Sequence, residues 1–301
     1  TKEKLLSLSI DNQFLATSSL LSSKAKATPQ IHVYKIRDQQ LSLFSSIPMD
    51  GDLNRNLIGF LPTTTPKLVY MKSEKEIGVW DVQKRTVVNS FSADRKIRKV
   101  VISPINEHII VLLENEGIVF KDFSSKKIEL EIGEASEAGF SPDGNRVLTG
   151  GQDGSLSLFD LYSIEVKKTN PTNSHGAMII SLAFGRENLI ASASWNRNMY
   201  VWDVSTFTDS STKFTDPFIQ LKERDLRDLY FHPSKPILLT QHKGQYLKSW
   251  FLSTKHLLKE VCKQLPTNRK SLSKSEWDEY IGQENLAYEP KNLFECTENP
   301  N

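Results

Sequence analysis

The stretch that most constrains this chain is 140–161, FSPDGNRVLTGGQDGSLSLFDL, because two tight turns divide it into short apolar segments. Ser-Pro-Asp-Gly at 141–144 is a turn in which Pro fixes φ, Asp bonds to its own backbone and Gly supplies a positive φ. Segments 147–149 and 156–159 have strand composition and flank the turn at 151–154, which predicts a β-hairpin. A unit this short cannot bury both of its faces alone, so we expect it to repeat and pack on its copies.

The same plan recurs along the chain. The clearest copy is 186–204, RENLIASASWNRNMYVWDV, in which a polar turn separates two strands and the second strand ends in Trp202-Asp203. Comparable positions in the other repeats are occupied by Tyr34, Trp80, Lys121, Phe159 and Trp250. Successive positions are about 46, 41, 38, 43 and 48 residues apart, near the length of a four-stranded propeller blade.

These repeats resemble the WD-repeat family, whose members fold as β-propellers. The resemblance covers roughly residues 4–252 and is carried by the dipeptides and turns quoted above. It implies an all-β fold, a β-propeller of WD-type blades over 1–254, with a short α-helical extension over 255–301 that packs on it. Six repeats are visible, which either close a ring by themselves or belong to a seven-bladed or larger array. The resemblance also implies structural roles for Trp80, Asp81, Asp160, Asp203 and Trp250.

Apolar patterns predict the strands of each repeat. The first three repeats are expected to use 5–11, 14–20, 31–36 and 41–49; 57–61, 68–71, 77–82 and 87–91; and 100–103, 109–113, 118–123 and 128–132. The last three are expected to use 147–149 and 156–159; 179–184, 189–192, 199–204 and 218–221; and 226–231, 237–240 and 247–252. The nearly continuous apolar runs at 100–102 and 109–113 predict strands that are buried on both faces.

The sixth repeat has no obvious outer strand. Segment 255–264, KHLLKEVCKQ, instead predicts a helix, with Leu257, Leu258 and Val261 at helical spacing. A second short helix is predicted around Trp277, and the two could cover the open edge of the last blade.

This tail is similar to the one that closes many bacterial multidomain WD-repeat proteins. The likeness rests on Cys262, Arg269, Trp277, Tyr280 and Cys296. In such proteins an effector domain precedes the propeller, so the resemblance implies an effector upstream of this chain. The two cysteines could pair, although a reduced, buried pair is expected in a cytosol.

Composition narrows the compartment and the kind of partner. The chain has 38 basic and 36 acidic residues, a net charge of +2 without a basic stripe, so we expect no nucleic acid. No apolar run reaches the roughly 18 residues of a membrane span, so no membrane association is expected. Two cysteines do not make a disulfide framework, which favours a reducing, cytoplasmic location.

The sequence offers no recognisable catalytic constellation. Gly-x-Ser-x-Gly, Cys-x-x-Cys and a Gly-rich loop before a helix are all absent from it. The histidines are dispersed over the repeats, at positions 32, 108, 175, 232, 242 and 256. We therefore predict no catalytic residue, no metal site and no cofactor.

One histidine is informative because it stands nine residues before Phe184, like the Gly-His element that precedes the inner strand in the family. The resemblance then implies a structural chain of hydrogen bonds whose members are His175, Ser192 or Ser194, Asn196 and Trp202. Because Asn stands where the family has Asp, this chain lacks a charged acceptor and is predicted to be weaker.

Members of the family bind partners through the loops between outer and inner strands and between second and third strands. In this chain those loops contain Lys24, Lys26, Glu116, Gln152, Asp153, Trp195, Arg197, His242 and Lys243. Trp195 beside Arg197 is the sharpest candidate, because Trp and Arg are favoured at interface hot spots.

Two functions remain open from the sequence. The first is a non-catalytic protein-interaction propeller, the sensor or scaffold end of a larger bacterial signalling or defence protein. The second is a free-standing WD-repeat scaffold subunit of a multiprotein complex. A propeller enzyme is disfavoured, because it would need convergent acids, histidines or metal ligands that the sequence does not show.

Overall fold

The described part of the chain consists of β-strands joined by turns and loops, and contains no helix. The computed structural model describes residues 2–9, 11–20, 30–48, 57–114, 116–122, 127–162, 175–186, 188–204, 217, 219–244 and 246–252. The predicted tail helices and the residues Cys262, Trp277 and Cys296 lie outside these ranges.

Six antiparallel sheets follow one another along the chain, each in simple sequential strand order. The first three sheets have four strands each: β1 (Lys2–Leu8), β2 (Phe14–Leu20), β3 (Gln30–Arg37), β4 (Gln40–Pro48); β5 (Leu57–Phe60), β6 (Lys67–Ser73), β7 (Glu76–Asp81), β8 (Thr86–Ser92); β9 (Ile97–Ile102), β10 (Ile109–Leu113), β11 (Gly117–Asp122), β12 (Lys127–Glu131).

The fourth and sixth sheets show three strands in the described residues, and the fifth shows four. Their members are β13 (Glu137–Phe140), β14 (Arg146–Gly150), β15 (Leu156–Asp160); β16 (Ile179–Phe184), β17 (Leu189–Ser194), β18 (Asn198–Asp203), β19 (Ile219–Lys222); β20 (Leu226–Phe231), β21 (Ile237–His242), β22 (Leu247–Phe251). The predicted all-β class and the division into six repeats are therefore confirmed.

The first strand was predicted with the wrong bounds, 5–11, and spans Lys2–Leu8. It ends at Leu8, not at residue 11, because Ser9 and Asp11 form a turn. The Ser9 hydroxyl donates to the Asp11 carboxylate at 2.5 Å and accepts the Phe14 N–H at 2.9 Å. Ser141 and Asp143 make the same contact at 2.5 Å in the turn that follows β13 of the fourth repeat.

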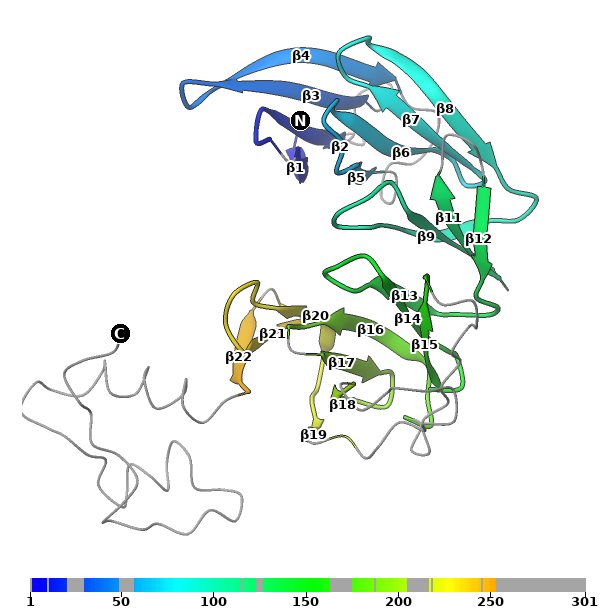
Figure 1. Ribbon diagram of the computed structural model, residues 1–301. Coiled ribbons are helices and arrows are strands. Elements are labelled where there is room, and N and C mark those ends of the chain that lie inside the picture. Colours follow the sequence, from blue (N-terminus) through cyan, green and yellow to red (C-terminus); the bar gives the residue numbers. More distant parts are fainter. Residues whose placement is uncertain are drawn as a thin grey trace, which may run out of the picture.

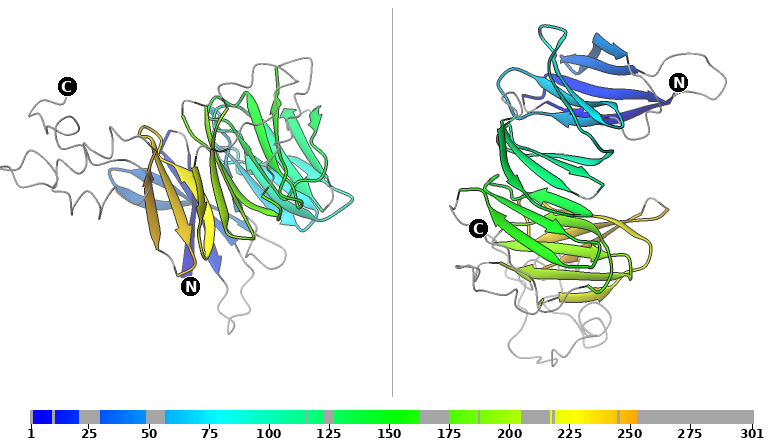
Figure 2. Two further views of the ribbon diagram at one scale, coloured as in Figure 1. Left: turned by 90° about the horizontal axis from the view of Figure 1, so that it is seen from below. Right: turned by 90° about the vertical axis from the view of Figure 1, so that its right-hand side faces the viewer.

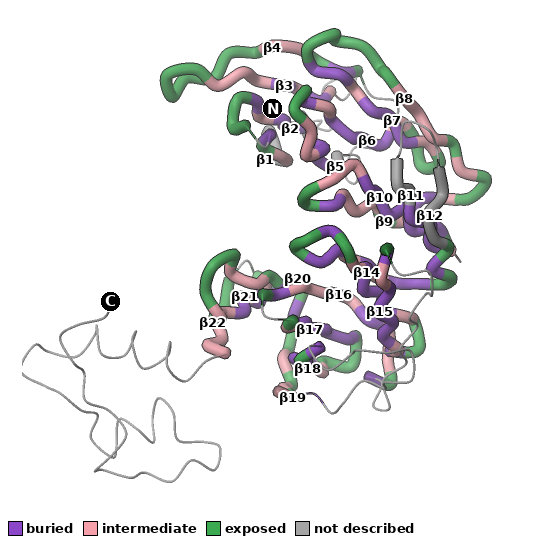
Figure 3. Tube along the Cα trace, in the orientation of Figure 1, coloured by how far each residue is buried: buried purple, intermediate pink, exposed green. Residues whose placement is uncertain are grey.

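The core lies between the sheets, because alternate residues of each second strand point to opposite neighbours. In β10, Ile109 and Val111 pack toward the second sheet with Val69 and Val79, whereas Ile110 packs toward the fourth sheet. All five residues of β10 are buried, as its continuous apolar run predicts. Figure 3 shows the buried positions concentrated in these middle strands and the exposed ones at hairpin tips and along β4.

The other continuous run, 100–102 in β9, was predicted to be equally buried and is only half-buried. β9 is the first strand of its sheet, and Val100, Val101 and Ile102 line an open hollow beside β5. The edge of β9 that faces away from β10 therefore has no strand beside it among the described residues, which leaves these side chains half-buried.

The sheets are arranged along an arc (Figure 1), with the first strands of the sheets on its concave side. The packed neighbours are consecutive sheets, through the pairs β1·β5, β5·β9, β9·β13, β13·β16 and β16·β20. The first and last sheets stand at the two ends of the arc and do not pack face to face over the described residues. Closure of the ring, either by these six sheets or as part of a seven-bladed or larger array, remains a prediction.

The two end sheets carry uncovered apolar side chains. Leu8 and Leu43 lie in one cross-strand row of the first sheet, on the face opposite Phe14 and Val33, and both are exposed. Tyr230 is exposed on the corresponding outer face of the last sheet. In the inner sheets both faces meet a neighbour, so the ends differ from the middle by packing, not by residue type.

In each sheet, turns between first and second strands and between third and fourth strands lie at one edge, and turns between second and third strands lie at the other. Figure 2 shows the strands of successive sheets standing roughly side by side, so that turns of one kind gather along one edge of the arc. We call the edge that carries the second-to-third-strand turns the upper edge.

Candidate functional site

The turn that joins β17 to β18 presents the most exposed aromatic side chain of the described residues. The Ser194 carbonyl accepts the Arg197 N–H at 3.0 Å, which closes the turn, and the Met178 carbonyl accepts the Trp195 N–H at 2.9 Å. The backbone of Trp195 is thus fixed by its neighbour while its side chain is 74% exposed. A rigid backbone under a free indole lowers the entropy cost of using that ring in a contact.

Arg197 occupies a strained backbone conformation in the same turn. Its φ is +73°, in the left-handed region that favours glycine. The equivalent turn between β14 and β15 places Gly154 there, with φ +85° and the same closing bond to Gly151. The left-handed conformation costs a non-glycine residue about 1–2 kcal/mol. Six other non-glycine residues of the described part also have a positive φ, so this strain accompanies the exposure of Trp195 and does not by itself mark a site.

The β14–β15 turn exposes two more of the predicted residues, Gln152 and Asp153. The Asp153 carboxylate accepts the Ser155 N–H at 2.9 Å. The Gly154 carbonyl accepts the His175 N–H at 3.2 Å, which connects this turn to the start of the fifth repeat. The candidate turns of the fourth and fifth sheets are therefore neighbours along the upper edge.

The remaining predicted contact residues divide into three groups. Lys243 is exposed in the β21–β22 turn, and Glu116 is half-buried beside β11. Lys24 and Lys26 lie outside the described residues. His242 was predicted to belong to an exposed loop, and this is corrected by the structure: its side chain is buried.

The predicted chain around His175 is present and includes both serines. His175 Nε2 lies 2.7 Å from Ser192 Oγ, which also accepts the Trp202 indole N–H at 2.9 Å. His175 Nδ1 lies 2.8 Å from Ser194 Oγ, which donates to Asn196 Oδ1 at 2.6 Å. Asn196 Nδ2 in turn donates to the His175 carbonyl at 2.6 Å.

The donor and acceptor roles along this chain of hydrogen bonds follow from its two end groups, Trp202 and Asn196. The Trp202 indole can only donate, and the Asn196 amide nitrogen is already used on the His175 carbonyl. The Ser194 hydroxyl therefore donates to Asn196 Oδ1 and accepts from His175 Nδ1–H, while Ser192 donates to His175 Nε2. The ring is neutral in this assignment, and burial lowers the pKa of His175 from 6.5 to about 4.

Asn196 therefore does more than replace a charged acceptor. Its amide accepts from Ser194 and also donates to the His175 carbonyl, a bond that a carboxylate could not make. The loss of charge that was predicted to weaken the chain is accompanied by an additional hydrogen bond.

A second chain of this type lies in the sixth repeat and was missed from the sequence. The Thr240 hydroxyl accepts the Trp250 indole N–H at 3.1 Å and lies 2.8 Å from His242 Nε2. His242 Nδ1 donates to the Arg224 carbonyl at 2.9 Å. The spacing was visible, because Thr240 precedes Trp250 by ten residues, as Ser192 precedes Trp202.

Trp80 shows what happens when the residue at that spacing is not Ser or Thr. Tyr70 stands ten residues before it, and the Trp80 indole nitrogen is buried without a hydrogen-bond partner among the described residues. Asp81 and Asp160, which follow Trp80 and Phe159 in the sequence, each close a turn. The Asp81 carboxylate accepts the Lys84 N–H and the Asp160 carboxylate accepts the Tyr162 N–H, both at 2.9 Å.

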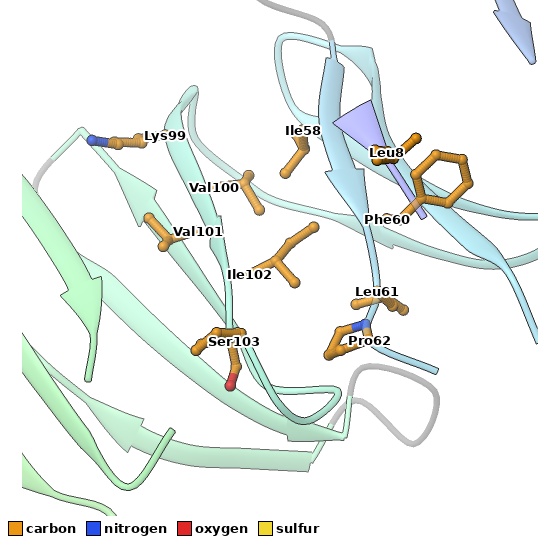
Figure 4. Close-up of a pocket in the computed structure, with 11 residues that line it drawn as sticks. Leu8, Ile58, Phe60, Leu61, Pro62, Lys99, Val100, Val101, Ile102 and Ser103 are labelled. Carbon is orange, nitrogen blue, oxygen red and sulfur yellow. The ribbon is translucent and has the colours of Figure 1, made fainter. Parts of the chain in front are cut away.

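A hollow of about 490 Å³ lies between β5 and β9 (Figure 4). Its lining is mostly apolar and comprises Leu8, Ile58, Phe60, Leu61, Pro62, Lys99, Val100, Val101, Ile102, Ser103 and Pro104. The one charged member, Lys99, forms an ion pair with Glu137 of the next sheet. This arrangement offers no nucleophile with an adjacent base.

Within the part of the chain that the structure describes, no three His, Cys, Asp or Glu side chains are grouped as metal ligands would be. In the same residues no helix is long and apolar enough to cross a membrane.

Comparison with known families identifies one repeat. Residues 135–160 match the family model described as "WD domain, G-beta repeat". The match covers the fourth sheet, β13 to β15, which contains the stretch from which the repeat pattern was read. A WD repeat is therefore present there, and the blade-like sheets on either side are consistent with it. The likeness of the tail to bacterial multidomain proteins remains a prediction.

Proposed function

We propose that this chain is a non-catalytic protein-interaction module, the sensor or scaffold end of a larger bacterial signalling or defence protein whose effector domain lies upstream. The WD repeat at 135–160 supports the interaction role, because such repeats generally serve protein–protein contacts. The proposed compartment is the cytoplasm, in keeping with only two cysteines in the chain.

The observation that carries the proposal is the turn at 194–197. It holds an exposed Trp195 on a fixed backbone beside Arg197, in a strained conformation that a glycine would adopt more easily. Trp and Arg are the residue types that contribute most at interface hot spots. Among the described residues, neither side chain forms a hydrogen bond or an ion pair, so neither is used to hold this turn together.

The interaction role is tested by capture of binding proteins from extracts of the source cells with the wild-type chain and with Trp195→Ala/Arg197→Ala. A specific partner should be recovered by the wild type and reduced at least about tenfold by the double variant. The control is Val87→Ala/Val88→Ala, which removes exposed apolar groups from β8, far from the upper-edge turns. Equal recovery by all three proteins would overturn the proposal.

The place of the chain in a larger protein is tested by immunoblot of source cells with an antibody against this segment. A band far above 34.2 kDa supports an upstream effector in the same polypeptide. A band near 34.2 kDa contradicts it and favours a free-standing scaffold subunit of a complex.

A further inference from the structure

Five exposed basic residues gather where the fifth and sixth sheets meet at the upper edge. They are Arg197 in the β17–β18 turn, Lys222 at the end of β19, Arg224 in the connection from β19 to β20, Lys243 in the β21–β22 turn and Lys248 in β22. We call this set the cationic corner.

Backbone hydrogen bonds bring these segments together. The Arg197 carbonyl accepts the Glu223 N–H at 2.8 Å, which places the 194–197 turn against the connection between the sheets. The Asp225 carbonyl accepts the Lys243 N–H at 2.7 Å, and the Arg224 carbonyl accepts from buried His242. The corner is therefore a fixed feature of the fold and not a chance approach of long side chains.

Most of this positive charge is not neutralised locally. Glu223 is largely buried and is paired with Lys248 at 2.7 Å, so that carboxylate is already used. The structure shows no ion pair between a described residue and Arg197, Lys222, Arg224 or Lys243 (the described ranges given above). Asp225 is the exposed acid within the connection.

Apolar and aromatic groups border the cations. Trp195 is exposed on one side, and Tyr246 and Leu247 are exposed on the other. The Tyr246 ring stacks on His242 with centroids 4.8 Å apart and planes 7° from parallel, which holds one face of the phenol ring in place. A ligand that satisfies this surface needs negative charge and an apolar side chain together.

We propose that the cationic corner binds an acidic peptide segment that carries an apolar or aromatic side chain. The inference rests on the proposed function and adds the chemistry of the partner. Single-stranded nucleic acid also combines negative charge with stacking rings. It is disfavoured because acids on the same edge, Asp153 and Asp225, would repel a continuous phosphate backbone, and because the whole chain has a net charge of only +2.

The test is selection of short random peptides, displayed on phage, against the full chain. The enriched sequences should have net negative charge and at least one Leu, Phe, Tyr or Trp. A synthetic peptide from the enriched pool should bind in a fluorescence anisotropy assay, and Arg197→Glu/Arg224→Glu should weaken it at least about tenfold.

The matched control is Arg186→Glu/Lys235→Glu. These two exposed cations lie in the β16–β17 and β20–β21 turns of the same sheets, at the opposite edge, and the net charge changes by the same amount. The control should change the affinity by less than about twofold. Equal weakening by both pairs would mean non-specific attraction and would overturn the inference.

The other outcomes are equally decisive. Enrichment of neutral or basic peptides, or tighter binding of oligothymidine than of the selected peptides, overturns the acidic-peptide inference and leaves an interaction role standing if Trp195→Ala still weakens binding. Failure to enrich any peptide above the background of uncoated wells overturns the acidic-peptide inference, whereas the interaction role is decided by the capture experiment with Trp195→Ala/Arg197→Ala.

Discussion

At the scale of single residues, the structure separates side chains that hold the blades together from side chains that are free to make contacts. His175, Ser192 and Trp202 are buried and linked to one another, so their polarity is used inside the protein. Trp195 and Arg197, a few residues away, have their backbone bonded and their side chains exposed. Ser194 and Asn196 of the same turn belong to the buried chain, so the turn combines groups that stabilise the fold with the side chains that are proposed to bind a partner.

The buried neutral His175 makes stability depend on pH. Its pKa is about 4 in the folded chain and near 6.5 in the unfolded chain, so the unfolded state binds more protons between these values. The stabilisation is complete above pH 6.5 and is lost as the pH falls toward about 4, by about 3 kcal/mol in total. Urea unfolding from about pH 7 down to about pH 4 should show this loss in the wild type.

The control is His175→Gln, which removes the titrating ring. Its unfolding free energy should be lower at neutral pH and should change less over the same interval. Parallel profiles for the two proteins would contradict the assignment of this pH dependence to His175.

Arg197→Gly should separate recognition from stability. Removing a side chain from a φ of +73° relieves local strain, so thermal unfolding should show no loss and a gain of up to about 1 kcal/mol. Binding of the partner or of the selected peptide should fall, because the guanidinium is lost. A destabilised variant would show that the Arg197 side chain supports the fold.

At the scale of elements, the turns of the upper edge are connected to the sheets beside them. Gly154 has a φ of +85°, and a Cβ there would lie 2.7 Å from the Ala177 carbonyl oxygen. Gly176 also has a positive φ, +65°, but a Cβ there would meet no atom within 4 Å. The two glycines thus differ in steric room although they share a backbone conformation.

Gly154→Ala and Gly176→Ala form a matched pair. Gly176→Ala should cost about 1 kcal/mol, the cost of the left-handed conformation alone. Gly154→Ala should cost more, because the new methyl group also forces apart the β14–β15 turn and the chain segment at Ala177. Chemical denaturation of both variants measures the difference, and equal losses would show that the contact with Ala177 relaxes freely.

At the scale of the whole molecule, stability is expected to be lowest at the two ends of the arc. The inner sheets are packed on both faces, whereas the first and last sheets are packed on one face and expose apolar groups such as Leu43 and Tyr230 on the other. Arrays in which each unit contacts only its neighbours open most readily at uncovered ends.

Native-state hydrogen exchange should therefore show the slowest amides in β10, β14 and β17 and faster exchange in β2 and β21. The comparison uses hydrogen-bonded amides of second strands in every case, so local strand position is matched. Uniform protection across all five strands would mean that the ends are covered in solution and that the chain unfolds as one unit.

The sequence by itself determined most of the local structure. Turn residues and alternating apolar positions located nearly all strands within a few residues, and the regular spacing of the positions equivalent to Trp202 identified the six repeats. A Ser or Thr ten residues before a Trp marks both buried chains in the sequence, although only the chain around Trp202 was recognised. These features are local, since a turn or a hairpin partner lies only a few residues away.

The tertiary structure alone decided which faces are covered. A period of two shows that a strand has two faces but does not show what lies against them. The apolar runs 100–102 in β9 and 109–113 in β10 therefore differ in burial. Buried His242 donates a hydrogen bond to the carbonyl of Arg224, which lies eighteen residues earlier and comes close only through tertiary packing. The cationic corner depends on the same long-range packing, because it assembles side chains from segments that are separate in the chain and meet only when the sheets are stacked.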